Sequence, residues 1–461
     1  MNNDAMVWDA TVKRLVAFAE RARHEDLSAK AVHETKLHLI DTFASALGAY
    51  DAEVSVMARA VAGRYRSDDT ARLWGSDMVT TPEMAAFANG VMIRTLDVSD
   101  TYLGRSRGHP SDMVSGLVAV AESVHADGKA LITAIVLAYD VYCSFCKSVD
   151  INSGGWDQPV YTVMGCVLGA AKLMRLSPEQ TGHALSLALT PNLALAQARR
   201  GSLSSWKGCA GANASRNAVF AAVLAKEGFT GPGEIFEGSG GFWDAVGRAD
   251  WPLPEAPMIG ETRTKFLPVC YHGQSAVFAA MDLRNKMDVQ RVDLRQIEEI
   301  RVDAYQVAVF MMGNDASRWA PTTRETADHS LPYCVAIALL DGKLVRDSFA
   351  DERLRDPAVA DLMRKVKVAE DPALTAQYPE AAPGRVTIRL RSGETFVAEI
   401  RYPRGHEKSP MSDTEVENKF RDLSGGLLGA PGCDQALKTL WQLENIKDAG
   451  AITALLVPHK S

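Results

Sequence analysis

The stretch 94–123 holds four titratable side chains directly before an apolar helical run: Asp97, Asp100, His109 and Asp112. Asp97 and Asp100 are three residues apart, so a helical segment would place them on one face. His109 would lie at the positive end of the following helix. An imidazole there loses some affinity for its proton and suits a base near neutral pH. The stretch therefore predicts proton chemistry at a helix entrance.

The same residue types also have a purely structural use. Ser111 or Asp112 could cap the helix that follows Pro110, because Ser and Asp side chains accept hydrogen bonds from free backbone N–H groups. In this alternative the aspartates are caps, and His109 is a loop residue with one backbone hydrogen bond. The stretch alone leaves both interpretations open.

Composition excludes several classes of protein. The chain has 461 residues, of which 47% are hydrophobic and 23% charged, enough for two or three domains' worth of core. A net charge of −7 and the lack of a long basic run argue against a nucleic-acid partner. The N-terminus does not resemble a signal peptide, and no apolar run approaches the roughly 20 residues of a membrane helix. We predict a soluble, cytoplasmic protein without a membrane partner.

The cysteines indicate packing rather than metal binding. Seven cysteines in a long chain fit a reducing compartment. Cys143 and Cys146 form a CxxC pair that could begin an iron–sulfur site, with Cys166 or Cys209 as a third ligand. The pair lies in an apolar helical pattern, however, where cysteine is a small buried residue. Zinc, calcium and phosphate-loop motifs are missing from the sequence, so we predict neither a metal nor a cofactor.

Hydrophobic periodicity predicts a helical first half. Apolar residues recur at helical spacing from Leu27 to Gly48. Similar Ala-rich amphipathic stretches follow at 53–64, 83–96, 113–125, 129–147, 160–174, 178–188 and 210–227. These stretches predict a large helical bundle.

The pattern changes after Pro268. Partial alternation over 296–310 favours a strand, and clean alternation over 385–402 predicts a hairpin around Ser392 and Gly393. A helix is expected over 326–342, and another helical segment over 413–423. The fold class is thus mainly α with an α+β lid. We place the lid at 269–406, inserted before C-terminal helices, with residues 1–268 and 407–461 forming the helical domain.

Five stretches, in order, resemble one known family. They are HLIDTFASALGAY (38–50), LDVSDTY with GHPSD (96–112), RRGSLSSWKGCAGANASRNAVFAAVLAKEGFTGP (199–232), KFLPVCYHGQSAVFAAM (265–281) and RETADHSLPYCVAIALLDG (324–342). Together they resemble the MmgE/PrpD family of 2-methylcitrate dehydratases and relatives. The resemblance implies a large helical domain with a smaller α+β lid, a homodimer, and catalysis without an iron–sulfur cluster.

The resemblance also implies a small polycarboxylate as substrate. Removing a proton next to a carboxylate creates additional negative charge, so a site without metal must supply cations and hydrogen-bond donors. Lys207 would project from a helix start, where the helix dipole lowers its ammonium pKa and helps to bind a carboxylate. The candidate groups within the motif stretches are His109, Arg199, Lys207, Lys265, His272 and Arg324.

Two branches of the family imply different reactions. The active-site positions of the cis-aconitate decarboxylase branch match Asp97, Thr101, His109, Lys207, Lys265 and Tyr333. Where that branch has a histidine five residues after the motif lysine, this chain has Cys270, and His272 follows two residues later. The dehydratase branch resembles this chain in the HPSD segment and in the pair Asp328–His329. We therefore favour hydration or dehydration over decarboxylation.

The resulting hypothesis is elimination of water from a 2-methylcitrate-like tricarboxylate, or the reverse addition. Its catalytic residues are Asp97, His109, Lys207, His272 and Tyr333, and its substrate-binding residues are Thr101, Arg199 and Lys265. His109, oriented by Asp97, exchanges the carbon-bound proton, and Tyr333 or His272 protonates the leaving hydroxyl. We expect Asp97, His109, Lys207, Lys265, His272 and Tyr333 to line one cleft between the helical domain and the lid.

Three other classes remain as alternatives. The same fold could decarboxylate cis-aconitate or epimerise a small amino-dicarboxylate, since these reactions share the first proton transfer. A catalytically silent relative could act as a binding protein, although the filled motif positions argue against it. A purely structural helical scaffold would have no reason to bring His109, Lys207 and Tyr333 together.

Overall fold

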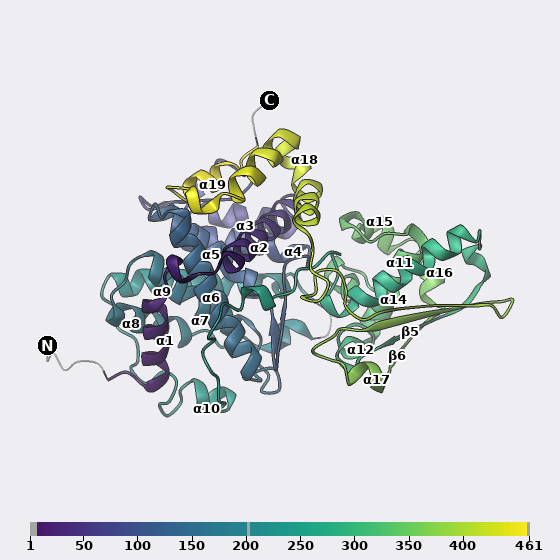
Figure 1. The fold of residues 1–461 in the computed structure, drawn as a ribbon, viewed down its shortest axis with the longest axis horizontal. Helices are drawn as coiled ribbons and strands as arrows, with labels where there is room; N and C mark the ends of the chain where they lie inside the picture. The colour runs from purple at the N-terminus through teal and green to yellow at the C-terminus, as the bar shows by residue number, and fades with distance from the viewer. Residues whose placement is uncertain (1–6, 201–202, 459–461) are drawn as a thin grey trace.

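The computed structural model describes residues 7–200 and 203–458. Twelve of its α-helices form one large unit, at the left and top of Figure 1. They are α1 (Ala10–Arg21), α2 (Ala29–Gly48), α3 (Glu53–Ala62), α4 (Pro82–Thr95), α5 (Val114–Ser123), α6 (Gly128–Ser148), α7 (Pro159–Leu173), α8 (Pro178–Leu189), α9 (Trp206–Lys226), α10 (Phe242–Val246), α18 (Asp413–Leu440) and α19 (Gly450–Ala454).

The second unit, at the right of Figure 1, combines a sheet with shorter helices. Its strands are β5 (Ile297–Ala304), β6 (Val366–Glu370), β7 (Gly384–Leu390) and β8 (Thr395–Ile400), in the order β6-β5-β7-β8. Strand β6 runs parallel to β5, and the other neighbours are antiparallel. Its helices are α11 (Gln274–Val289), α12 (Gln306–Met312), α13 (Arg324–Ala327), α14 (Leu331–Asp341), α15 (Asp351–Leu354), α16 (Pro357–Met363) and α17 (Pro372–Thr375).

Each unit has its own hydrophobic core. The helical core draws on residues from Val12 to Ile259 and again from Met411 to Leu456. The second core runs from Leu267 to Ala398 and joins α11 and α14 to the sheet. The predicted mainly α fold with a small α+β portion is therefore confirmed. On the basis of the two cores, we propose residues 269–406 as the lid and residues 1–268 and 407–461 as the helical domain.

Capping residues explain where several helices begin. The side chains of Ser28, Asp127 and Ser177 each accept a hydrogen bond from a backbone N–H group in the first turn of α2, α6 and α8. Helix α6 is long and apolar enough to cross a membrane, but 89% of its apolar window is buried inside the protein. Its buried residues belong to the hydrophobic core of the helical unit.

The lid departs from the expected pattern in two places. The predicted strand over 296–310 ends at Ala304, and its last residues form α12 instead. The predicted helix over 326–342 is broken into α13 and α14. The break falls at Asp328 and His329, so neither side chain belongs to a helix.

Two small hairpins complete the helical unit, β1 (Ala71–Arg72) with β2 (Val79–Thr80), and β3 (Tyr102–Leu103) with β4 (Arg107–Gly108). Helix α18, which follows the lid in the chain, returns to α2 through buried Lys419. The Lys419 ammonium donates hydrogen bonds to the Asp41 carboxylate and, at 2.8 Å each, to the backbone oxygens of Val98 and Lys265. One side chain thus joins three distant segments.

Candidate active site

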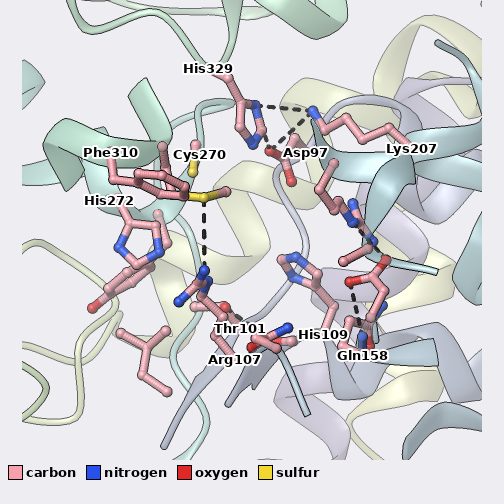
Figure 2. Close-up of a pocket in the computed structure, with 18 of the residues that line it drawn as sticks. Asp97, Thr101, Arg107, His109, Gln158, Lys207, Cys270, His272, Phe310 and His329 are labelled. Carbon is pink, nitrogen blue, oxygen red and sulfur yellow. Dashed lines mark hydrogen bonds and ion pairs between the residues drawn. The ribbon is translucent and has the colours of Figure 1, made fainter. Parts of the chain in front are cut away.

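A cavity of about 400 Å³ is lined by residues of both units. Figure 2 shows side chains from the helical domain and from the lid facing each other across it. Among the described lining residues, seven are arginines or lysines and three are aspartates: Arg94, Arg105, Arg107, Arg199, Arg200, Lys207 and Lys265 against Asp97, Asp150 and Asp157. This excess of positive charge favours an anionic ligand.

Asp97 is the buried carboxylate at the centre of the lysine cluster. It lies in the loop after α4, not on a helix, and its φ of 50° is in the left-handed region, which is uncommon for a non-glycine residue. Its Oδ1 accepts hydrogen bonds from Lys265 Nζ at 2.8 Å and Arg94 Nη2 at 3.1 Å, and Lys207 Nζ is 3.6 Å from Oδ2. Burial raises the pKa of this carboxyl, but the three cations lower it by more, to well below its usual range.

His109 faces the cavity as a neutral imidazole. Its Nδ1 is 2.6 Å from the backbone oxygen of Asp100. Because a carbonyl oxygen only accepts, Nδ1 carries the proton and Nε2 keeps a free lone pair. Burial, with Arg94 and Lys265 nearby, holds the His109 pKa well below its usual value. His109 is therefore oriented by the Asp100 main chain, and the expectation that Asp97 orients it is wrong.

The other two aspartates of the motif have structural partners. Asp100 accepts hydrogen bonds from the Ser111 N–H at 3.0 Å and from the Tyr139 hydroxyl at 2.8 Å. Asp112 pairs with Arg94 at 3.3 Å, and burial raises the pKa of Asp112 to about 6. Helix α5 has no side-chain cap, so the capping alternative is wrong for the helix that it named. Neither aspartate lines the cavity.

Lys207 lies in the first turn of α9, as expected, and meets two residues of the lid. Its Nζ donates to Asp328 Oδ1 at 2.9 Å and is 3.1 Å from His329 Nδ1. His329 Nδ1 is itself 2.5 Å from Asp328 Oδ1. Burial lowers the pKa of His329, but the charges of Cys270 and Asp328 raise it by more. The lid thus supplies a histidine of raised pKa where the sequence offered only a two-residue resemblance.

Cys270 and His272 flank the start of a short 3-10 helix (Tyr271–Gly273) and both line the cavity. His272 Nδ1 is 2.7 Å from the Tyr305 hydroxyl. Burial, followed by the charge of Arg107, holds the His272 pKa well below its usual value. A neutral imidazole of this kind is a poor proton donor at pH 7. The placement of His272 agrees with the prediction, whereas its protonation disfavours a role as acid.

The predicted substrate-binding residues also lie at the cavity. Arg199 lines its wall and pairs with Asp157 through Nε, at 2.9 Å. Thr101 lines it too, and its hydroxyl donates to the Gly108 backbone oxygen at 3.1 Å. Gly201 and Ser202 of the lysine motif lie outside the described residues.

Tyr333 is the exception among the predicted site residues. It belongs to the lid core on α14, is 1% exposed, and does not line the cavity. Its hydroxyl donates to the Ser348 backbone oxygen at 2.7 Å, which satisfies it away from any substrate. Its assignment as a proton donor is wrong on this geometry. Arg324 likewise lies outside the cavity, with its guanidinium over the Phe349 ring.

Four arginines at the cavity were not predicted: the exposed Arg105 and Arg200, and the more buried Arg94 and Arg107. Arg94, on α4, looked like an ordinary helix residue, but it is 3% exposed and bridges Asp97 and Asp112. Arg107, on β4, has its Nη2 3.9 Å from Met311 Sδ of α12 and makes no ion pair with any described carboxylate. A guanidinium in this state is available to an incoming anion. No local sequence signal distinguishes these arginines from surface ones.

Asp97, Asp328 and His329 offer ligand atoms within 4.8 Å of one another. Lys207 Nζ, however, lies within 3.6 Å of all three side chains, and Lys265 Nζ contacts Asp97 as well. Two ammonium groups already neutralise the carboxylates that a divalent cation would need. We assign no metal to this cluster.

Two domain models of one protein family match most of the chain. The N-terminal domain of the MmgE/PrpD family matches residues 13–253, and its C-terminal domain matches residues 267–443. The chain belongs to the MmgE/PrpD family. This confirms the resemblance on which the site prediction was based, and makes the chain a lyase-type enzyme.

Relatives of this MmgE/PrpD protein have two different names. A 2-methylcitrate dehydratase of Escherichia coli K12 is 28% identical over 425 residues, covering 86% of each chain. A 2-methylcitrate dehydratase of Cupriavidus necator is 28% identical, covering 84% of each chain. Human cis-aconitate decarboxylase is 25% identical over 460 residues, covering 93% of this chain and 91% of its own.

Proposed function

We propose that this enzyme eliminates water from a 2-methylcitrate-like tricarboxylate, or adds water in the reverse direction, without a cofactor. The observation that carries the proposal is the cavity with seven basic and three acidic side chains, next to the neutral imidazole of His109. A tricarboxylate would offset much of the surplus charge. The names of the relatives support the same substrate class.

His109 is the base in this proposal. Its free Nε2 removes a proton from the carbon next to a carboxylate, while the Asp100 carbonyl holds Nδ1–H and fixes the ring. The low pKa of His109 keeps the ring unprotonated at neutral pH. A base that is already free of its proton loses no activity to competing protonation.

The cations of the cavity stabilise the charge that develops as the proton leaves. Lys207 and Lys265 face the carboxylate being activated, and Asp97 holds both ammonium groups in place. Arg199 and Arg107 bind the remaining carboxylates. Precise positioning of the substrate contributes to the rate enhancement. Loss of one carboxylate-binding cation can therefore slow turnover as severely as loss of the base.

Dehydration and decarboxylation need a proton donor in different places. Decarboxylation requires a donor aimed at the carbon that loses carbon dioxide, whereas dehydration requires one aimed at a hydroxyl. Cys270 stands where the decarboxylase branch has a histidine. We therefore favour dehydration, with cis-aconitate decarboxylation and epimerisation of an amino-dicarboxylate as the alternatives that the experiment must separate.

A substrate panel tests the proposal. Purified protein is incubated with 2-methylcitrate, citrate, cis-aconitate and related hydroxy acids, and the products are identified by mass spectrometry. We expect a 2-methylcitrate-type substrate to lose water and cis-aconitate to give no itaconate. The His109→Ala protein, purified in parallel, shows that the activity is not a contaminant. Itaconate as the main product would refute the assignment.

Two properties of the whole protein complete the proposal. The enzyme is a homodimer, as the family resemblance implies, and it acts in the cytoplasm, as the composition and cysteine content suggest. It has neither a nucleic-acid nor a membrane partner. Light scattering of the purified protein tests the dimer, and fractionation of cells tests the compartment.

A further inference from the structure

Cys270 differs from the other six cysteines of the chain. All seven are free and buried, but only Cys270 lines the cavity. Cys334, also in the lid, donates to the Ala327 backbone oxygen at 3.3 Å and is part of the hydrophobic core. Burial raises the pKa of Cys334 and of the five remaining thiols.

The neighbours of Cys270 reverse this effect. Burial alone would raise the Cys270 pKa, but the charge and hydrogen bond of His329 lower it by more. The charge of Lys265 also lowers the Cys270 pKa, and the charge of Asp97 raises it. Since His329 Nδ1 is directed at Asp328, the bond to sulfur falls to Nε2. Cys270 and His329 therefore line the same cavity, and Asp328 holds the His329 ring from the far side.

We propose that Cys270 and His329 together deliver the proton to the leaving hydroxyl group, an assignment that rests on the proposed dehydration. Among the described residues, the acids expected from the sequence fail at this task. Tyr333 lies in the lid core, and His272 is neutral at pH 7. Cys270 and His329, by contrast, both line the cavity, and Asp328 holds the His329 ring, so a proton on either group lies within reach of a bound substrate.

The proposed elimination conserves both protons and electron pairs. His109 Nε2 takes the carbon-bound proton, and the electron pair of the C–H bond forms the carbon–carbon double bond. The C–O bond breaks with its electrons on oxygen, the Cys270 thiol gives its proton to that oxygen, and water leaves. The His329 Nε2 proton moves to sulfur, and Asp328 steadies the ring through Nδ1. Proton exchange with solvent at His109 and His329 resets the site.

Replacing Cys270 by alanine distinguishes proton donation by its thiol from a purely structural role of the side chain. We expect Cys270→Ala to slow water loss by at least about a hundredfold, the lower range for an acid–base group. Exchange of the substrate carbon-bound proton with deuterated water should continue, because His109 is intact. Cys334→Ala is the matched control in the same unit, and it should retain normal turnover.

A changed leaving group gives the decisive measurement. Fluoride leaves without a proton, so a substrate with fluorine in place of the hydroxyl needs no acid. We expect Cys270→Ala to eliminate fluoride within about tenfold of the wild-type rate, although it dehydrates the hydroxy acid far more slowly. Equal losses on both substrates, loss of proton exchange, or near-normal dehydration would each overturn the assignment.

Thiol alkylation tests Cys270 even if the substrate panel fails. With iodoacetamide at pH 7, peptide mass spectrometry should find Cys270 alkylated faster than the other six cysteines, and citrate should protect it. In His329→Asn the alkylation should slow by at least about tenfold, because Cys270 loses the neighbour that lowers its pKa most and a smaller fraction of the thiol is deprotonated. An unreactive Cys270, or a rate unchanged in His329→Asn, would contradict the proposed pair.

Discussion

The Asp97 carboxylate holds three cations around itself in a cavity that must also admit an anionic substrate. Its charge prevents Lys207, Lys265 and Arg94 from repelling one another when the site is empty. A buried carboxylate that loses its partners, or a buried cation that loses its carboxylate, destabilises a protein by about 3–5 kcal/mol. Asp97 is therefore a positioning group, and proton transfer falls to His109.

His109→Ala tests the base. Removal of Nε2 should lower kcat for dehydration by at least about a hundredfold, since general bases contribute that much or more. Deuterium exchange at the substrate carbon should fall with it. His33→Ala is the control, because His33 does not line the cavity and instead pairs with Asp413 and stacks on Trp441. A His109→Ala enzyme with near-normal turnover would remove His109 from the mechanism.

Arg107→Gln tests a half-buried cavity arginine that has no described carboxylate partner. A charge-assisted bond to a substrate carboxylate is worth about 1.5–3 kcal/mol, so KM for a tricarboxylate should rise by roughly ten- to a hundredfold. A dicarboxylate analogue that lacks the third group should be affected less. Arg64→Gln, at an exposed position that does not line the cavity, is the matched control. Equal effects of the two variants would exclude a specific clamp.

At the scale of elements, the close packing of α7 against α6 fixes the backbone of the helical domain. Gly165 on α7 approaches α6 so closely that an added Cβ would lie 2.6 Å from the Ala138 backbone oxygen and 2.5 Å from Met113 Sδ. We expect Gly165→Ala to destabilise the protein by about 1–3 kcal/mol, as overpacking does. The free energy of unfolding in urea measures the effect.

Gly425→Ala on α18 is the opposite case. Its Cβ would meet no atom within 4 Å, so the substitution only improves helix propensity and should stabilise by up to about 1 kcal/mol. If both glycine variants shifted the unfolding midpoint in the same direction, the packing of α6 against α7 would not be the cause.

Local sequence patterns predicted the helices well and the site only in part. Apolar spacing fixes which face of α2 or α7 is buried, and cap residues such as Ser28 fix where a helix starts. The residues that form α12 were expected to continue the strand β5. Their helical conformation depends on contacts with β6 and the lid core, which no local sequence pattern encodes. The same holds for His329, whose protonation comes from Cys270 and Asp328 and not from its sequence neighbours alone.

At the scale of the whole molecule, a buried acid makes stability depend on pH. Burial raises the pKa of Asp140, on α6, to about 7, although its Oδ1 accepts a hydrogen bond from the Met258 N–H at 2.7 Å. A folded pKa above the unfolded value of 3.8 means that the folded state binds more protons, so this group's contribution to stability falls as pH rises from about 4 to 7.

Asp140→Asn should remove this dependence. An amide oxygen can accept the same hydrogen bond without charge, so the variant should gain on the order of 2 kcal/mol relative to wild type between pH 5 and pH 8. Urea unfolding at the two pH values measures the gain. Wild-type and variant curves that stay parallel across this range would rule out Asp140 as the source.

Metal removal provides a further whole-protein test. The enzyme should keep its activity after exhaustive chelation and show no visible iron–sulfur absorption, since Cys143 and Cys146 are packed in the bundle core. Activity that is lost on chelation and restored by iron alone would make these cysteines ligands and would overturn the mechanism.

Lys419 gives the molecule an order of assembly. The residue belongs to α18, which the ribosome makes only after the whole lid. Its ammonium nevertheless holds the backbone oxygens of Val98 and Lys265. These two positions fix the ion pair between Asp97 and Lys265. A nascent chain that has completed both the first helices and the lid still lacks this link. Catalytic competence therefore arrives late in biosynthesis, with the return of the chain to the domain where it began.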